Sequence, residues 1–516
     1  MTKLRHKSNR HIVKRIIVRA TLVLDTPTCL GSGDADSPTD LPLLRDSISN
    51  HALLTGSSIA GALRNYLRER DKGYEESDRR HDLAAKLFGD LFAYKDERDK
   101  TEAEKIKLRE QDSQSPLIID DAISTQPIKA ELRDGVKINS VTRTAADKAK
   151  YDLELLQAGT KFPLSFELLM EKEANQTDLL QGLAIALSGL EQGEISLGMK
   201  KRRGFGCCHV KEWQVWNFNL EDASDRISWL LFDRDCTNKL PIITNKIVDA
   251  LDVALDERED KRDRFCLHAK FQLVGSLLIR SGQDSNICAP DVVHLKSYRP
   301  DQSTEPVAVL SGTSLAGVLR HRAERIVNTL QEINPQITQE IVNEIFGFVK
   351  DKKESQQPEA KASRLIVHEK VIKNAKDLVQ NRIAIDRFTG GAYHGALFSE
   401  QPIFGGTQTI VPIELELRNP KEYEIGLLLL LLKDLWTQDL PVGGESSIGR
   451  GGLQGRDATL TWYNLEEPRE WKISQQSKQL KVEDLRNSSN TEHLVKQSLQ
   501  KFVDALFEYS VEETDQ

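Results

Sequence analysis

The chain contains one sequence pattern twice. Residues 56–64 read GSSIAGALR and residues 312–320 read GTSLAGVLR, an offset of 256 residues in a chain of 516. Upstream positions pair at an offset of 251: Leu22 with Leu273, Val23 with Val274, Gly31 with Gly282, and Asp40 with Asp291. An internal repeat of about half the chain constrains the architecture strongly, because both copies should adopt the same fold.

Further landmarks follow in the same order in both copies. These are LFG at 87–89 and IFG at 345–347, charged stretches at 94–114 and 349–363, aliphatic runs at 117–119 and 365–367, and glycine-rich loops at 198–206 and 443–452. A shared order of landmarks indicates duplication. We therefore predict homologous domains at 1–215 and 262–465, a helical connector at 216–261, and a polar segment with a C-terminal helix at 466–516.

The composition is typical of folded domains with charged loops. Hydrophobic residues make up 39% of the chain, and 79 acidic residues nearly balance 71 basic ones, which gives a net charge of −8. An acidic total disfavours non-specific nucleic-acid binding, but the distribution of the cations decides the matter. The longest apolar run, 425–432, is too short for a membrane span, which needs about 20 residues.

The N-terminal residues are basic and lead directly into a strand-like run, in which Arg19 interrupts any apolar signal core. The six cysteines contain no CxxC pair, which argues against a zinc site or a disulfide framework. We expect a cytoplasmic protein without a membrane partner.

Each copy shows the same predicted order of elements: a strand, a helix, further strands, a second helix, a glycine-rich loop and a final strand. The first helix, at SSIAGALRNYLRER, has one apolar face, and Ser57 or Ser58 is its expected N-cap. This order suggests an α+β fold of the ferredoxin-like type with insertions. Residues 493–509 also have apolar side chains at helical spacing and should pack on a domain surface.

The two helix starts are candidate phosphate sites. A glycine is followed by hydroxyl residues in both copies, by Ser57 and Ser58 in the first and by Thr313 and Ser314 in the second. Such a start offers unpaired backbone N–H groups at the positive end of the helix dipole. The alternative is an ordinary capped helix.

The loop GMKKRRGFG at 198–206 is strongly basic. Its cations are Lys200, Lys201, Arg202 and Arg203. Its glycines allow a polyanion to approach the backbone, and Phe205 is available for stacking on a base. The alternative is a solvated basic turn.

The long loop after the first strand contains several aspartates, of which Asp40 alone matches an aspartate of the second copy, Asp291. One carboxylate per copy suits a general base or an electrostatic role better than a complete cation cage, and solvation of the loop is the alternative. Arg143 and Arg387 lie in long loops rich in small residues, where an arginine can hold a phosphate or a base, or pair with adjacent acids.

Together these motifs resemble the RAMP superfamily, and within it the Cas-seven type backbone subunits of type III CRISPR effector complexes. The matching segments are DLPLLRD from Asp40, TGSSIAGALR, LFG, the loop with DRFTGGA and GALF, and KKRRGFG. A chain with two such domains resembles the tandem backbone subunits of the III-D branch. The resemblance implies two modified ferredoxin-like (RRM-like) domains, each with an inserted thumb loop.

The resemblance also implies a function in antiviral defence. It implies a ribonucleoprotein subunit that binds the CRISPR RNA guide, assembles with other subunits of the complex and cleaves complementary target RNA. It places the catalytic aspartates at Asp40 and Asp291, with a divalent metal ion, expected to be Mg²⁺, for which Asp40 is a candidate ligand. The implied RNA-binding residues are Ser57, Ser58, Arg64, Arg143, Lys200, Lys201, Arg202, Arg203, Gly204, Phe205, Gly206, Thr313, Ser314, Arg320, Arg387 and Arg450.

The second copy departs from the family pattern. Asp291 is followed by VVHLKS, without the expected proline and final aspartate, and the loop GGESSIGRGG has much less positive charge than its counterpart. These departures weaken the case for cleavage at Asp291. Three other functions stay open: a non-catalytic RNA-binding backbone subunit, a CRISPR-RNA processing endonuclease that uses a histidine such as His209, and an α+β scaffold unrelated to RNA.

Overall fold

The computed structural model describes residues 11–32, 42–77, 82–89, 101, 103–104, 114–139, 142, 144–172, 174–232, 239–255, 260–281, 290–330, 335–349, 360–464, 467–476, 479–487 and 491–512. We call the described residues up to 255 the first repeat and those from 260 onward the second repeat. None of the helices in this part of the chain is both long and apolar enough to cross a bilayer.

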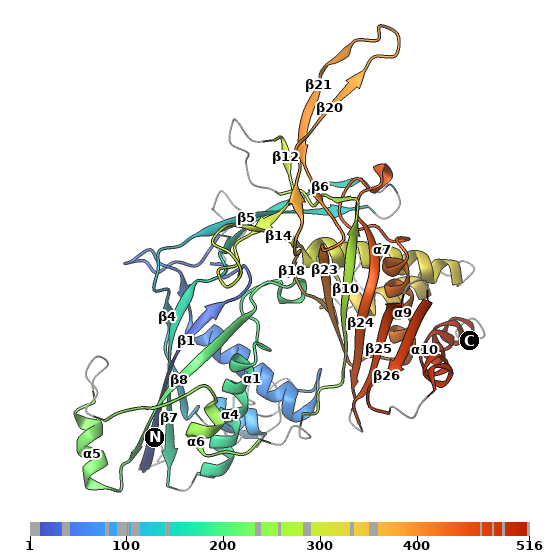
Figure 1. Ribbon diagram of the computed structural model, residues 1–516. Helices are drawn as coiled ribbons and strands as arrows, with labels where there is room; N and C mark the ends of the chain where they lie inside the picture. Colours follow the sequence, from blue (N-terminus) through green and yellow to red (C-terminus); the bar gives the residue numbers. More distant parts are fainter. Residues whose placement is uncertain are drawn as a thin grey trace.

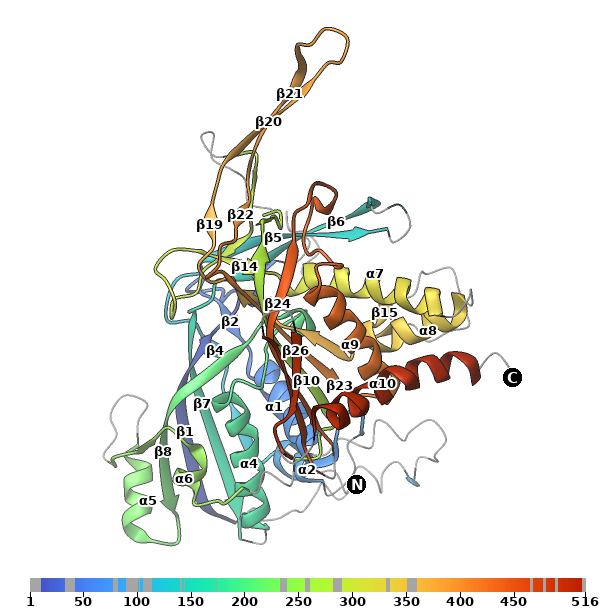
Figure 2. The ribbon, with the colours of Figure 1, turned by 45° about the vertical axis from the view of Figure 1, so that its right-hand side comes forward.

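Sheets and helices alternate along the molecule (Figure 1). From left to right in that view come α5 (Ala223–Leu230), the first sheet, α1 (Gly56–Lys72) with α4 (Gln176–Glu191), and the second sheet. The helices α1 and α4 of the first repeat therefore lie between the two sheets. Figure 2 shows α7 (Gly312–Leu330) and α9 (Glu422–Trp436) beside the second sheet.

The first sheet is antiparallel and has the strand order β3-β7-β1-β8-β9. Its strands are β1 (Ile12–Leu24), β3 (Leu117–Ile119), β7 (Lys161–Glu171), β8 (Cys208–Asn219) and β9 (Ile242–Thr244). Apolar residues alternate along β7 as expected for a sheet with one buried face, and they join Leu63 and Leu183 of the helices in one core. The short helices α2 (Leu83–Phe88) and α6 (Ile247–Leu251) pack on α4.

The second sheet is also antiparallel and has the order β17-β23-β10-β24-β25-β26, in which the first four strands repeat the order β3-β7-β1-β8. Its strands are β10 (Arg264–Val274), β17 (Leu365–Val367), β23 (Ile410–Arg418), β24 (Gly452–Tyr463), β25 (Arg469–Gln476) and β26 (Gln479–Asp484). The matching order agrees with a duplicated unit. α8 (Pro335–Phe346) packs beside α7.

Each repeat also carries a long hairpin. These are β5 (Ala130–Ile138) with β6 (Ala145–Leu156), and β20 (Gln380–Ile385) with β21 (Ala392–Gln401). Figures 1 and 2 both show the second hairpin projecting far from the two sheets. The remaining short strands are β2 (Leu53–Leu54), β4 (Ala122–Ile123), β11 (Ser276–Leu277), β12 (Val292–Val293), β13 (Lys296–Ser297), β14 (Val307–Leu310), β15 (Phe348–Val349), β16 (Ala360–Lys361), β18 (Lys370–Val371), β19 (Lys376–Asp377) and β22 (Ile403–Phe404).

The strand register corrects the predicted offset of 251 for the opening strands. Leu24 pairs with Cys208 and Leu273 pairs with Leu453, and these partners occupy the same place after the two glycine-rich loops. Leu24, and not Leu22, is therefore the counterpart of Leu273, at an offset of 249. Sequence alone does not distinguish the offsets of 251 and 249, because each aligns aliphatic residues of one strand with aliphatic residues of the other.

The offset becomes 251 further along, at Leu43 and His294. Gly31 bridges Leu43, and Arg280 bridges His294 in the second repeat. Two more residues separate the second pair than the first, so Gly31 corresponds to Arg280, not to Gly282. Asp40 and Asp291 each lie three residues before the downstream bridge partner, which supports their pairing in the sequence, although Asp40 itself lies outside the described residues.

The predicted connector at 216–261 is not a separate helical segment. Strand β8 continues to Asn219, β9 pairs with β8 at the edge of the first sheet, and among the described residues of this range helix occurs only in α5 and α6. Within the run 247–264, α6 covers 247–251, the described residues 252–255 and 260–263 are not helical, and β10 begins at Arg264. Likewise, the polar segment after 466 forms β25 and β26 before α10 (Glu492–Glu512).

Two details of the helices differ from expectation. The N-cap of α1 is Thr55, whose side chain accepts a hydrogen bond from the backbone N–H of Ser58, so neither Ser57 nor Ser58 is the cap. α10 packs on α9 through Val495, Phe502 and Leu506, but Leu494 is 52% exposed.

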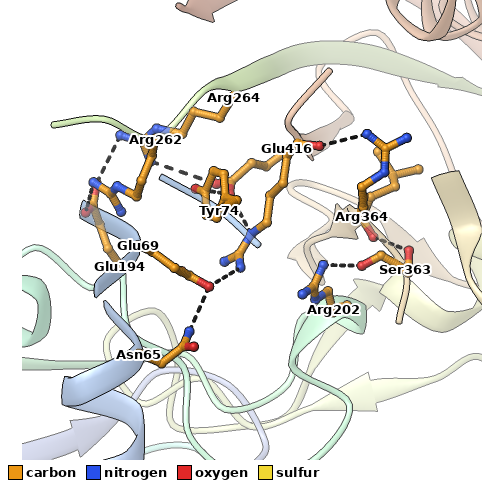
Figure 3. A network of polar contacts seen from close by, with 12 residues as sticks. Asn65, Glu69, Tyr74, Glu194, Arg202, Arg262, Arg264, Ser363, Arg364 and Glu416 are labelled. Carbon is orange, nitrogen blue, oxygen red and sulfur yellow. Dashed lines mark hydrogen bonds and ion pairs between the residues drawn. The ribbon is translucent and has the colours of Figure 1, made fainter. Parts of the chain in front are cut away.

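The repeats meet in a polar interface, which we call the joint. At its lower end Glu69 Oε1 lies 3.1 Å from Arg418 Nη1, Glu194 Oε2 lies 2.8 Å from Arg262 Nη2, and the Tyr74 hydroxyl donates to Glu416 (3.3 Å). Figure 3 shows these side chains bridging the helix ends of the first repeat and the strands of the second. The first sheet is thus linked to the second through its own helices.

At the upper end of the joint, Glu369 is completely buried between two arginines. Its carboxylate accepts from Arg133 of β5 (3.0 Å and 3.3 Å) and from Arg299 of the second repeat (2.5 Å). Glu131, next to Arg133, accepts from the Ser297 hydroxyl and the Tyr298 N–H. The base of the first hairpin is therefore fixed to the second repeat.

Two equivalent glycines test the joint. Gly204 and Gly449 both have left-handed backbones, with φ of 85° and 83°. A Cβ on Gly204 would lie 2.2 Å from the Glu369 backbone N, whereas nothing lies within 4 Å of a Cβ on Gly449. We expect Gly449→Ala to cost about 1–2 kcal/mol of unfolding free energy from backbone strain, and Gly204→Ala to cost a further ~1–3 kcal/mol from overpacking. Urea unfolding measures both, and equal losses would contradict this structure of the joint.

Candidate nucleic-acid interface

The basic loop of the first repeat lies in the joint. Lys200 has a left-handed backbone, and Lys201–Arg203 then form a 3₁₀ turn that ends at Gly204. The Arg202 guanidinium donates to the Ser363 carbonyl of the second repeat. The glycine makes this approach possible because any side chain there would meet the backbone of the second repeat.

The same loop reaches the start of α7. A Cβ on Gly312, the first residue of α7, would lie 2.3 Å from the Arg203 carbonyl oxygen, so the two backbones touch. Thr313 and Ser314 follow in the first turn of α7 and are half-buried. The structure thus brings a cationic loop from the first repeat to a helix N-terminus of the second. Sequence reasoning assigned these two features to separate sites.

The cations of this composite site lie near further arginines. Burial, and then the charge of Arg418, lower the pKa of Lys201 and of Arg202. Burial, and then the charge of Arg320, lower the pKa of Arg203. These pKa values are lowered mainly because burial penalises the charged forms, and the neighbouring arginines add like-charge repulsion, which a phosphate group would relieve.

Arg320 supports this site from α7. Its guanidinium donates to the Gly347 carbonyl (2.7 Å) and to Asn343 Oδ1 (2.8 Å), and Nε lies 3.6 Å from Glu324. These contacts hold the side chain in place on the second repeat. The charge of the Arg320 guanidinium acts on Arg203 through space.

One residue of the predicted RNA surface, Phe205, faces inward instead, and Lys200 is half-buried. Phe205 is 2% exposed and packs with Cys29, Leu153 and Leu155, so its ring is not available for stacking on a base. Beside it, Lys200 Nζ lies 3.7 Å from the ring centre of Tyr151. The second hairpin strand of the first repeat covers this side of the loop, and local sequence gives no sign of that contact.

Arg450, the counterpart of Phe205, is also buried, with 3% of its side chain exposed. Its guanidinium pairs with Glu400 (2.8 Å) and with Glu445 (2.9 Å). Arg450 therefore holds its own loop together and does not face solvent. The exposed residues of that loop are Gly444 and 446–449, among which Ile448 is 53% exposed.

The first-repeat helix start is partly occupied by the protein itself, because the Gly56 N–H donates to Asp121 Oδ1 (2.7 Å). Ser57 and Ser58 are exposed, and their hydroxyls hydrogen-bond to Thr55 Oγ1 at 3.0 Å and 2.9 Å. Arg64 is half-buried on the same helix. This start keeps the hydroxyl groups that the sequence singled out, but no loop of the described chain covers it as the first-repeat loop covers α7.

Asp291 lies at the base of the second hairpin. Its Oδ2 accepts from the backbone N–H (2.7 Å) and the hydroxyl (3.1 Å) of Ser399, and its own N–H donates to the Ser399 hydroxyl (3.1 Å). These hydrogen bonds lower the pKa of Asp291, which keeps it ionised. A carboxylate fixed in this way suits an electrostatic or ligand role better than proton abstraction.

The tip of that hairpin exposes Arg387 together with aromatic side chains. Phe388 is 99% exposed and Tyr393 is 62% exposed. Asp386 closes the turn by accepting from the N–H groups of Phe388 and Thr389, each at 2.8 Å. The corresponding Arg143 of the first hairpin, like Asp40, lies outside the described residues.

No three His, Cys, Asp or Glu side chains converge within the described part of the chain. Asp291 therefore offers one carboxylate at an exposed position. Mg²⁺ commonly uses one or two carboxylates together with water and substrate phosphates, so a single carboxylate fits such an ion when RNA supplies the rest.

His209, the candidate for RNA processing, is held by the protein. Its Nδ1 lies 2.7 Å from Asp25 Oδ1, and its Nε2 is buried without a hydrogen-bond partner in the described structure. A ring with neither nitrogen in solvent cannot exchange protons with an RNA on the surface. This geometry does not favour the processing role.

The family comparison agrees with this duplicated architecture. The family model described as RAMP superfamily matches residues 21–209 and again residues 270–454. No curated protein matches the sequence. The two matched regions coincide with the two repeats.

His294, three residues after Asp291, generates a pH prediction. Burial lowers its pKa to about 4, although its Nε2 lies 3.3 Å from the Val309 carbonyl. Since the unfolded histidine titrates near ~6.5, the unfolded state takes up the proton first, and stability falls as pH drops from about 6.5 to 4, by up to ~3 kcal/mol. His294→Leu, which introduces the residue found at the equivalent Leu43, should remove this part of the pH dependence. Urea unfolding at several pH values measures it, and an unchanged pH slope would contradict the assignment.

Proposed function

Because this chain belongs to the RAMP superfamily, we propose that it is a tandem backbone subunit of a type III CRISPR effector complex, similar to those of the III-D branch. In this function it binds the CRISPR RNA guide, assembles with other subunits and cleaves complementary target RNA. Members of the superfamily are RNA-binding proteins associated with CRISPR systems, so the general class follows from the family. The subunit type and the cleavage are our proposal.

The observation that carries the proposal is the composite site in the joint. Lys201, Arg202 and Arg203 meet the N-terminus of α7, and their pKa values are lowered. A phosphodiester backbone that crosses the joint would meet cations from one repeat and helix N–H groups from the next. The overall charge of −8 does not oppose this, because the cations are concentrated there.

Sequence choice in this function comes from base pairing. Backbone contacts fix the position of an RNA without reading its bases. The guide would then select the target by complementarity, as in other RNA-guided systems. This division of labour fits a site made of guanidinium groups, an ammonium group and a helix start.

The projecting hairpin is our candidate for the thumb. Its exposed tip residues Arg387, Phe388 and Tyr393 are of the types that contact phosphates and stack on unpaired bases. We propose that it inserts along the guide–target duplex and displaces a target nucleotide. The first hairpin would act in the same way through the segment around Arg143.

Cleavage is proposed beside these hairpins, at Asp291 and at Asp40. A displaced target nucleotide can align its 2′-hydroxyl with its own 3′-phosphate. Attack then forms a cyclic phosphate, the 2′-hydroxyl proton passes to water, and the 5′-oxygen of the next nucleotide leaves and takes up a proton from water. A divalent ion such as Mg²⁺, when bound, supplies charge neutralisation at the phosphate. Asp291, held ionised by Ser399, would orient that ion together with the RNA.

Guide binding yields a salt-dependent prediction. Arg203→Gln should lower the affinity for single-stranded guide RNA about tenfold and reduce the slope of log K against log salt by roughly 1, since one phosphate contact is lost. Arg325→Gln, an exposed arginine elsewhere on α7, is the matched control and should change neither quantity. Filter binding over a salt series measures both, and unchanged binding by Arg203→Gln would reject the composite site.

Cleavage yields a separate prediction. In the reconstituted complex, Asp40→Asn and Asp291→Asn should each remove one set of target-RNA products and leave guide binding intact. Asp457→Asn, on the outer face of the second sheet, is the control. Gel analysis of end-labelled target measures the products. If both variants keep every product, the subunit is a non-catalytic RNA-binding backbone.

A further inference from the structure

The outer face of the second sheet is covered by the first repeat. Arg264 of β10 binds Glu194, and Glu416 of β23 accepts from Tyr74. Two neighbours on this outer face, Cys266 and Thr461, are only 9% and 7% exposed. One sheet therefore receives the helix ends of the preceding repeat.

The strand registers identify the same positions on the first sheet. Arg15 pairs with Leu169 and Phe218 as Arg264 pairs with Arg418 and Tyr463. The counterparts of Arg264, Cys266, Thr461 and Tyr463 are therefore Arg15, Ile17, Trp216 and Phe218. No earlier repeat is present among the described residues to cover them.

Helix α5 covers these positions instead. Phe232, just after α5, packs edge-on against Trp216 (5.5 Å between ring centres) and Phe218 (5.3 Å). The Arg15 guanidinium lies 4.3 Å from the ring centre of Trp229. As a result Ile17, Trp216 and Phe218 are 9%, 3% and 0% exposed. Figure 1 shows α5 on the side of the first sheet away from the second repeat.

We propose that α5 is a built-in cap. It covers the outer face of the first sheet, and the equivalent face of the second sheet is covered by the first repeat. The cap therefore prevents another copy of this chain from stacking head-to-tail on the first sheet. The joint is a heterologous interface, because it links different surfaces of the two repeats. Such an interface extends into a filament, or closes into a ring, unless one end is blocked. Arrays of repeats commonly need terminal caps for the same reason.

A joint between two copies of the chain would also use the glycine-rich loop of the second repeat and strand β3 of the first. Both have exposed residues. Gly449 faces open space and Ile448 beside it is 53% exposed, whereas the equivalent Gly204 contacts the second repeat. On the receiving side, Ile118 of β3 is 44% exposed, whereas the equivalent Ile366 of β17 is 9% exposed beneath the first-repeat loop. The apolar residues at the two free ends are compatible with each other, whereas the outer face of the first sheet is covered by α5.

Sedimentation velocity of the full chain without RNA tests the cap. The wild type should sediment as a monomer over a wide concentration range. The double variant Trp229→Asp with Phe232→Asp should detach α5 and show a sedimentation coefficient that rises with concentration. Adding Ile448→Asp should return that variant to the monomer, because it places a charge at the free end of the second repeat.

The matched control is Ile227→Asp with Leu230→Asp, on the exposed side of α5, which should leave the chain monomeric. Far-UV circular dichroism checks that each variant is folded, and Trp229→Ala with Phe232→Ala provides a milder release if the aspartates unfold the chain. The proposal is overturned if the wild type self-associates. It is equally overturned if the folded released variant stays monomeric, or if Ile448→Asp leaves its association unchanged. The proposal does not depend on the RNA-binding function.

Discussion

The buried carboxylate of Glu369 is the contact on which the rest of the structure depends. It receives Arg133 from the first repeat and Arg299 from the second, with no exposure to water. Burial alone would raise the pKa of Glu369, but the two arginines lower it below its usual range. A buried charge cluster of this kind adds little net stability compared with apolar packing, yet removing one member is costly. Its effect here is to fix the base of the first hairpin and the basic loop beside it against α7.

The duplicated fold has diverged most where the two repeats meet other surfaces. Lys200, Arg203 and Phe205 of the first loop correspond to Glu445, Ile448 and Arg450 of the second. Both loops keep the same left-handed positions, so the backbone is shared while the charge is reversed or lost. One loop became part of a cationic interface, and the other is held by its own ion pairs. A tandem chain can therefore contain one complete joint and two different ends.

Local pattern was sufficient to predict the elements that bury one face. Alternation along β7 and β23 and the apolar stripe of α1 and α7 follow directly from residue spacing, as does the packing of Phe502 in α10. The joint was not predictable in this way. In the sequence, Glu369 is an acidic residue after an aliphatic strand and looks like an ordinary loop residue. Its arginine partners lie 236 and 70 residues away in the sequence.

The basic loop shows the same limit. The sequence shows that its cations are exceptional in an acidic chain. It also suggests that the aromatic residue among them stacks on a base, whereas β6 buries Phe205.

Ultraviolet cross-linking of the guide-bound protein, with the adducts mapped by mass spectrometry, tests the composite site most directly. We predict adducts both within 200–203 and within 313–320. Guide cross-links confined to other segments, with both of these unmodified, would contradict an RNA path across the joint.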